Sequence, residues 1–168
     1  MDRPIIDPKT MCHFVIVVKD IEKAAVEWAK LLGVESLPIR ARGDGSGTPA
    51  QDHDSRNHYR GDYNYGIGPE YEWLEADIQM NGFIIELIQP EKGKGPFKEY
   101  FDQHGTGIHH IAFRNERCDE FNDQLEKDGY EYIVDCYSPN GDRWPVHNTE
   151  NVLGTNLCIK PSKNSLKA

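Results

Sequence analysis

The chain has 168 residues, with 28 Asp and Glu against 19 Lys and Arg, and a formal net charge of -9. This length suits a single domain, spanning residues 1–168, with a core of its own. The acidic balance argues against a nucleic-acid partner, because phosphate contacts need clustered Lys and Arg. No apolar run approaches the roughly 18 residues of a membrane span. Residues 1–4 also lack the apolar core of a signal peptide, so a cytoplasmic protein without a membrane partner is expected.

The first half of the chain begins with a β-branched run over residues 12–18 that predicts a buried strand. A helix follows, with Asp20 as its N-cap and Gly33 as the glycine that ends it. Residues 34–41 form a weaker candidate strand. Pro38 favours a place at the sheet edge for it, because proline donates no hydrogen bond.

Residues 42–69 interrupt this pattern with a loop rich in Gly, Asp, Asn, His and Tyr. Long loops inside a compact domain are uncommon, and the tyrosines favour a functional lid over a disordered insert. Strands at 70–80 and 83–89 follow, joined by the turn pair Asn81-Gly82. Pro90 is expected to end the second of them. Residues 12–90 are thus predicted to form one βαβββ module.

The second half repeats the order of the first. A linker with a short helix around residues 96–103 leads into a second module at 108–160. Its expected elements are a strand at 108–114, a helix from Cys118 to Gly129, and strands at 130–137, 143–148 and 152–159, with a turn at 139–142. The fold class is therefore α+β, built from paired βαβββ modules.

A histidine opens the first strand of each module. Residues 107–113 echo residues 12–18, which aligns His110 with His13. By the two-residue period of a strand, the neighbouring His109 is expected on the opposite face. The last strands also correspond, because residues 82–87 match 154–159 and so align Glu86 with Cys158.

Glu86 is hard to explain as a structural residue, because it stands between Ile85 and Leu87 in a strand with apolar residues on both faces. A buried carboxylate is costly unless it is paired or binds a cation. Two imidazoles and a carboxylate form a common open ligand set for a divalent ion. Residues His13, Glu86 and His110, with Cys158 in the fourth position, therefore predict a metal site. The other cysteines lack a C-x-x-C pair and are expected to be mostly buried apolar residues.

Residues 13–24, 86–90 and 107–113 resemble the vicinal oxygen chelate superfamily, which includes glyoxalase I, extradiol dioxygenases, bleomycin-resistance proteins and methylmalonyl-CoA epimerase. The likeness is greatest to the epimerase branch. It implies a half-open, curled mixed sheet that holds a divalent metal ion such as cobalt, zinc, manganese or nickel. It also implies a homodimer. Cys158 departs from the pattern, since a Glu is usual there, and a thiolate suits zinc or cobalt better than manganese.

The resemblance also implies the reaction. In the epimerases a Glu on the strand before the Glu-Leu strand acts as the base, and Glu70, followed by Glu72, matches its position. Such a site takes a proton from a carbon next to a carbonyl and returns it on either face, while the metal stabilises the enolate oxygen. The protein is therefore expected to be an isomerase, an epimerase or racemase of a small carbonyl compound.

Several substrates fit this chemistry. An acyl-CoA such as methylmalonyl-CoA is favoured slightly over an aromatic ketone such as the isoflavanone dihydrodaidzein, which the tyrosines of the insert would suit. A binding or resistance protein without catalysis, and a lyase like glyoxalase I, are further alternatives. The loss of a fourth carboxylate favours the binding protein, and the presence of Glu86 argues against it.

Overall fold

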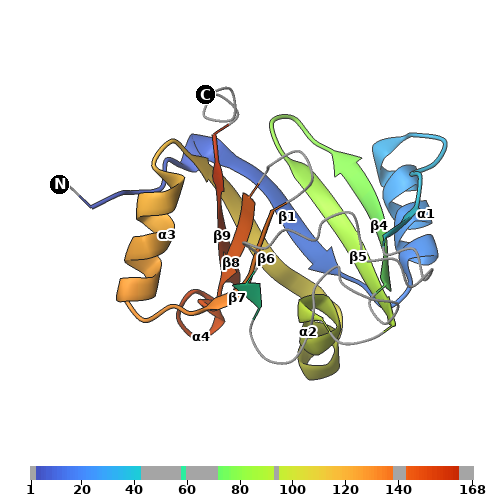
Figure 1. Ribbon diagram of the computed structural model, residues 1–168. Helices are drawn as coiled ribbons and strands as arrows, with labels where there is room; N and C mark the ends of the chain where they lie inside the picture. The colour runs from blue at the N-terminus through green and yellow to red at the C-terminus, as the bar shows by residue number, and fades with distance from the viewer. Residues whose placement is uncertain (1–2, 43–57, 60–71, 93–94, 138–142, 163–168) are drawn as a thin grey trace.

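The computed structural model describes residues 3–42, 58–59, 72–92, 95–137 and 143–162. Its strands form one mixed sheet in the order β2-β4-β5-β1-β6-β9-β8-β7-β3, which curls without closing (Figure 1). The strands are β1 (Met11–Val17), β2 (Arg40–Arg42), β3 (His58–Tyr59), β4 (Glu72–Gln79), β5 (Ile84–Lys92), β6 (Gly107–Asn115), β7 (Tyr132–Tyr137), β8 (Arg143–His147) and β9 (Asn156–Pro161). The helices are α1 (Ile21–Leu32), α2 (Pro96–His104), α3 (Cys118–Lys127) and α4 (Glu150–Leu153), after a 3-10 turn at Pro8–Thr10.

The sheet consists of two halves that meet at the antiparallel pair β1 and β6. In each half the first strand pairs in parallel with the last, β1 with β5 and β6 with β9. The registers also agree, because Val15 lies opposite Glu86 as Ala112 lies opposite Cys158. The predicted α+β fold of paired βαβββ modules in a half-open sheet is confirmed.

Helices α1 and α3 cover the outer face of the sheet (Figure 1). Asp20 caps α1 by accepting a hydrogen bond from the Lys23 backbone N–H at 2.9 Å, and Gly33 ends the helix with φ of 69°. A positive φ is strained for residues with a Cβ, so glycine suits this position. The α1 side of the sheet is packed by Ile21 and the outward residues of β4 and β5, among them Ala76, Ile78, Ile85 and Leu87.

The inner face carries a separate set of buried apolar residues, which we call the inner apolar cluster. Helix α2 lies against one end of this face and contributes Phe97 to the cluster (Figure 1). The sheet strands supply the other members: Val15, Val17, Ile88, Ala112, Ile133, Val134, Val146 and Cys158. Any site on the inner face must therefore occupy the polar positions that lie beside this cluster.

Three predicted strand boundaries are wrong. The strand expected at 34–41 is reduced to β2 at the sheet edge, after Pro38, a residue that cannot donate a ladder hydrogen bond. Pro90 does not end β5, which runs on to Lys92. The pairing of β5 with β1 ends at Ile88, so Pro90 does not have to donate a hydrogen bond to β1. The strand expected at 152–159 begins only at β9, because its first residues belong to α4.

The long insert at 42–69 lies mostly outside the described residues, and so does its interpretation as a lid. Three of its residues are described. Arg42 ends β2, and His58 and Tyr59 form β3, which pairs with β7 at the far edge of the sheet. The turn expected at 139–142 also lies outside the described residues.

Candidate metal centre and active site

The four residues predicted as metal ligands share the inner face of the sheet. Successive side chains of a strand alternate between faces, so a residue two positions from a cluster member faces the same way. Cys158 is itself a member of the inner apolar cluster. The other three candidates each lie two positions before a member of it on the same strand: His13 before Val15, Glu86 before Ile88, and His110 before Ala112.

The four candidates are also aligned across the strands. Glu86 lies opposite Val15, which lies opposite His110 on the next strand. His13 lies opposite Ala112, which in turn lies opposite Cys158. Each histidine therefore shares a cross-strand row with the last-strand candidate of the other module.

His13 and His110 come together at the junction of the modules. Their Nε2 atoms lie 3.2 Å apart, and His110 is only 3% exposed. Burial, together with the charges of Lys160 and Arg114, lowers the pKa of His13 to about 2. Burial, followed by the neighbouring histidines and Lys160, also holds the pKa of His110 well below its ordinary value. Both rings are thus neutral at pH 7, the form that binds metal.

The separation of the two Nε2 atoms fits a shared metal ion. Two nitrogens that each lie ~2.0–2.1 Å from one ion, at tetrahedral or octahedral angles, are about 2.9–3.4 Å apart. The observed 3.2 Å falls in this range. The second ring nitrogen of a histidine ligand usually donates to an acceptor, which fixes the ring and its tautomer. Here the Nδ1 atom of His110 lies 2.8 Å from the Nδ1 atom of His109.

The position of His109 corrects the sequence-based expectation that it faces away from His110. The register between β1 and β6 shifts at Val15 and Ile16, which leaves a β-bulge at His109. A bulge interrupts the alternation of faces. The ring of His109 consequently packs on the inner side against α2, with centroids 5.0 Å from Phe97 and 5.3 Å from Tyr100.

Glu86 belongs to an acidic group. Its carboxylate lies with those of Glu75 and Asp77, and ligand atoms of all three are within 4.8 Å of one another. Arg40 donates to Glu75 at 2.5 Å and to Asp77 at 2.7 Å. These hydrogen bonds, Asp77 first, raise the pKa of Arg40, so the guanidinium stays charged and offsets part of the negative charge.

Cys158 lies in different surroundings. Its side chain is 0% exposed and is enclosed by the inner apolar cluster. Burial is the main cause that raises the pKa of its thiol to about 12. Among the described residues, the one group of three or more His, Cys, Asp or Glu with ligand atoms within 4.8 Å is Glu75, Asp77 and Glu86. The structure thus brings His13 and His110 together but leaves Glu86 and Cys158 outside a common group with them.

The two predicted bases are placed only in part. Glu70 lies outside the described residues, and Glu72 is the first residue of β4, with only its backbone described. The structure adds Glu75, which is 5% exposed on the inner face. In the sequence Glu75 stands between the apolar residues Leu74 and Ala76, which face outward, and this alternation indicates an inward position for Glu75. The ion pair between Glu75 and Arg40 has no such local pattern, because it depends on the pairing of β2 with β4.

The comparisons with known proteins place the chain in a family. A model of the glyoxalase/bleomycin resistance protein/dioxygenase superfamily matches residues 12–146. The chain belongs to this superfamily. Its members commonly bind a divalent metal ion, which agrees with the arrangement of His13 and His110. A search of the curated proteins found no match.

Several solved structures resemble this one along nearly their whole length. Methylmalonyl-CoA epimerase from Mycobacterium tuberculosis has a TM-score of 0.58 at 13% identity, covering 95% of this chain and 92% of that one. The Streptomyces coelicolor epimerase, solved with 2-nitronate-propionyl-CoA, has a TM-score of 0.58 at 12% identity, covering 92% and 94%. A hypothetical protein from Bacillus halodurans has a TM-score of 0.60 at 17% identity, covering 91% and 94%. At these identities the likeness shows the fold.

In the part of the chain that the structure describes, no helix is long and apolar enough to cross a membrane.

Proposed function

We propose that this protein is an epimerase or racemase that exchanges a proton at a carbon next to a carbonyl group. The observation that carries the proposal is the pair of histidines His13 and His110, with Nε2 atoms 3.2 Å apart, on a face that also holds an acidic group of carboxylates. Removal of such a proton leaves negative charge on the carbonyl oxygen. The reaction therefore needs a base and a positive partner for that oxygen.

We propose that His13 and His110 hold a divalent metal ion. Glu86, whose carboxylate lies with those of Glu75 and Asp77, would turn toward the two histidines to complete the set. The ion would act as a Lewis acid that stabilises the enolate oxygen. The histidines supply neutral nitrogen ligands. Glu86 supplies the carboxylate from β5, the strand next to His13. Cobalt, zinc, manganese and nickel all accept this mixed set of nitrogen and oxygen ligands.

A carboxylate is proposed as the base. Glu70 and then Glu72 keep the role expected from the sequence, and Glu75 joins them as a buried carboxylate on the inner face. The base takes the proton from the substrate carbon and the electron pair moves to the carbonyl oxygen. A second carboxyl group, protonated at the start, returns its proton to the opposite face of the carbon, so the two carboxyl groups exchange protonation states. Arg40 orients Glu75 through their hydrogen bond.

An acyl-CoA of the methylmalonyl-CoA kind is the substrate we favour. Its support is the similarity in fold to epimerases, one of which was solved with methylmalonyl-CoA. An aromatic ketone such as an isoflavanone is the second candidate. It is favoured by aromatic rings on the inner face, where Trp73 and Phe97 meet edge to face with centroids 6.0 Å apart. Flat apolar substrates pack well against such rings.

Isotope exchange tests the proposal. The metal-loaded protein is incubated in deuterated water with methylmalonyl-CoA and, separately, with one enantiomer of an isoflavanone. Deuterium should enter the carbon next to the carbonyl of one of the two substrates, and the optical purity of that substrate should fall. Glu70→Gln, Glu72→Gln and Glu75→Gln should identify the base, because only its loss removes exchange while metal binding persists. If the protein binds one of these two compounds tightly but catalyses no exchange with either, the result would support a non-catalytic binding protein instead.

A homodimer in the cytoplasm is proposed by analogy with the superfamily, whose members are often dimers. Light scattering after size-exclusion chromatography should give twice the mass of the chain, 19.2 kDa.

A further inference from the structure

Two cations lie on neighbouring strands of the inner face, where β6 and β9 end. Arg114 follows Ala112, a member of the inner apolar cluster, by two positions, and Lys160 follows Cys158 in the same way. By the alternation of a strand, both side chains point to the inner side of the sheet. The parallel register places Arg114 directly opposite Lys160. Both residues are half-buried, so the sheet holds two positive charges together on this face.

Neither cation has an acidic partner within the described residues. The Nη1 atom of Arg114 donates to the backbone carbonyl of Pro161 at 2.8 Å, a neutral acceptor that does not balance the charge. The chain has 28 acidic and 19 basic residues, yet no carboxylate in the described ranges forms an ion pair with Arg114 or Lys160. Two adjacent cations without a carboxylate attract an anion and offer it several N–H donors.

The basic pair lies next to the histidines of the candidate metal centre. His13 lies opposite Ala112, and Arg114 is the next inner residue along β6. Two residues of a strand span about 6.6 Å, so the pair begins one such step from the row of His13. Burial lowers the pKa of His13 most, and the charges of Lys160 and Arg114 lower it further, so their field reaches this ring.

The acidic group of the inner face lies on the other side of the histidines. Glu75, Asp77 and Glu86 belong to β4 and β5. In the sheet these strands precede β1, whereas β6 and β9 follow it. The histidine pair therefore stands between a negative and a positive part of the face. A compound with an acidic group is oriented by this difference, with its anion toward β9 and its other end toward the carboxylates proposed as bases.

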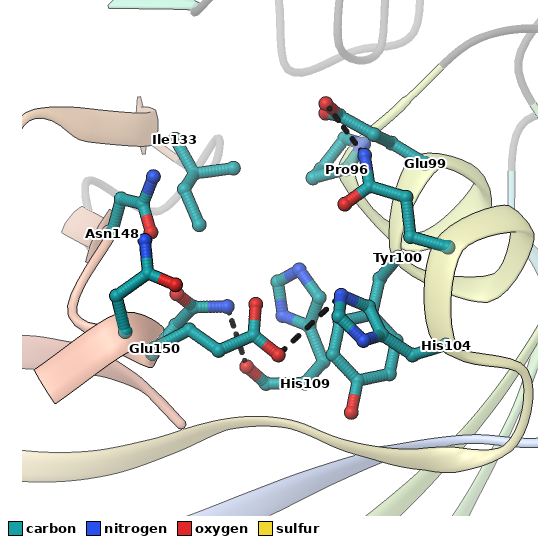
Figure 2. A pocket seen from close by; sticks show the side chains of 11 residues that line it. Pro96, Glu99, Tyr100, His104, His109, Ile133, Asn148 and Glu150 are labelled. Carbon is teal, nitrogen blue, oxygen red and sulfur yellow. Dashed lines mark hydrogen bonds and ion pairs between the residues drawn. The ribbon is translucent and has the colours of Figure 1, made fainter. Parts of the chain in front are cut away.

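The opposite end of β6 does not suit an anion. A cavity of about 250 Å³ lies there between α2 and α4, and the ring of His109 points into it (Figure 2). The described residues that line this cavity include Glu99 and Glu150 but neither Lys nor Arg, and Glu150 approaches His104 to 3.5 Å. Acidic walls repel an anion, so an acidic compound is directed to the end of β6 that holds Arg114.

We propose that Arg114 and Lys160 form a binding site for a carboxylate group, carried by the compound whose carbonyl lies at the histidine pair. Turnover of that compound rests on the proposed function, whereas binding of the carboxylate does not. The Arg114 guanidinium, held by Pro161 through Nη1, donates its remaining N–H groups to the carboxylate, and the Lys160 ammonium donates beside it. A neutral isoflavanone has no such group, so the site favours the acidic acyl compound as substrate.

Binding of methylmalonate to the metal-free protein, followed by NMR of the 15N-labelled chain, tests the site. Its neutral diamide, methylmalonamide, controls for size and shape, and the absence of metal prevents direct coordination. Saturable shifts are expected for the backbone at the ends of β6 and β9, with at least about tenfold weaker binding of the diamide. Arg114→Gln and Lys160→Gln should each weaken methylmalonate binding about three- to tenfold. The matched change Lys127→Gln, at an exposed lysine of α3, should leave affinity unchanged.

Three results would overturn the site. Equal affinity for methylmalonamide would mean that charge plays no part in binding. An equal loss in Lys127→Gln would mean that net charge, and not the basic pair, attracts the anion. Shifts that never saturate would mean that methylmalonate occupies no defined place.

The deuterium-exchange experiment separates this site from the proposed function. If methylmalonate binds as expected but no substrate exchanges its proton, the carboxylate site is supported and the epimerase is not. If methylmalonyl-CoA exchanges with unchanged KM in both Arg114→Gln and Lys160→Gln, the epimerase is supported and the carboxylate site is wrong.

Discussion

The two modules place different residues at the same structural position. Glu86 and Cys158 occupy equivalent places on β5 and β9, opposite Val15 and Ala112. Glu86 lies in an acidic group with Asp77, whereas Cys158 is closed inside the inner apolar cluster. The shared register determines which way the side chains of Glu86 and Cys158 point. The next strand in the sheet, β4 beside Glu86 and β8 beside Cys158, supplies the neighbouring residues and so determines whether the surroundings are acidic or apolar.

Replacing Cys158 with Glu would make the two modules alike and should have the largest effect. The new carboxylate would enter the inner apolar cluster, where Val134 and Val146 are 1% and 0% exposed. The free energy of unfolding should fall by at least about 3 kcal/mol. Urea denaturation measures this loss.

Cys158→Ala is the matched control for that change, since it keeps the site apolar and should cost only about 1 kcal/mol. Its metal affinity should equal that of the original protein. A Cys158→Glu protein that is fully stable and binds metal more tightly would show instead that this position can supply a fourth ligand.

Removing either histidine at the module junction should have the next largest effect. His13→Ala or His110→Ala takes away one of the two neutral nitrogens that lie 3.2 Å apart, so affinity for Co2+ should fall more than about 100-fold. The visible absorption of bound cobalt, with zinc competition, measures the change.

His104→Ala provides the control for non-specific loss of an imidazole, because His104 is exposed and contacts Glu150 outside the junction. Equal cobalt affinity in the His13, His110 and His104 variants would remove the metal centre from the proposed function.

Much of this arrangement could be predicted because it depends on local patterns. The cap at Asp20 and the glycine at Gly33 bound α1 as expected. The likeness of residues 12–18 to residues 107–113 aligned His13 with His110 and predicted one shared site for them. Such signals lie within a few residues of the chain.

The parts that could not be predicted depend on pairing between distant segments. The bulge at His109 arises where β1 pairs with β6, so the alternation of residues along β6 alone does not predict it. The ion pairs of Arg40 need β2 beside β4. The enclosure of Cys158 needs Val146 on β8, across an antiparallel pair that the sequence of β9 alone does not specify.

Replacing His109, which contacts the proposed ligand His110, should lower metal affinity less than replacing His110 itself. A His110 ring that binds metal through Nε2 carries its proton on Nδ1, and His109 Nδ1 lies 2.8 Å away as its acceptor. His109→Leu removes that acceptor, so metal affinity should fall about 10- to 100-fold. His109→Asn keeps an oxygen near the Nδ1 position and should restore most of the affinity. In the metal-free protein, 15N imidazole spectra should show the Nδ1–H form of His110 in the original protein and in His109→Asn, and mixed forms in His109→Leu.

Thiol labelling should show the smallest effect, because the enclosure of Cys158 predicts almost no reaction. Only the thiolate attacks iodoacetamide, and a pKa raised from 9.0 to about 12 cuts the thiolate fraction at pH 8 about a thousandfold. Burial blocks access as well, so native labelling of Cys158 should proceed no faster than unfolding. Cys12 is only partly buried and should react before Cys118 and Cys158, which are both buried. Mass spectrometry of peptides after timed labelling, with urea-unfolded protein as the reference, measures both rates. Rapid native labelling of Cys158 would mean that the inner apolar cluster opens, and that the thiol can reach a metal held by His13 and His110.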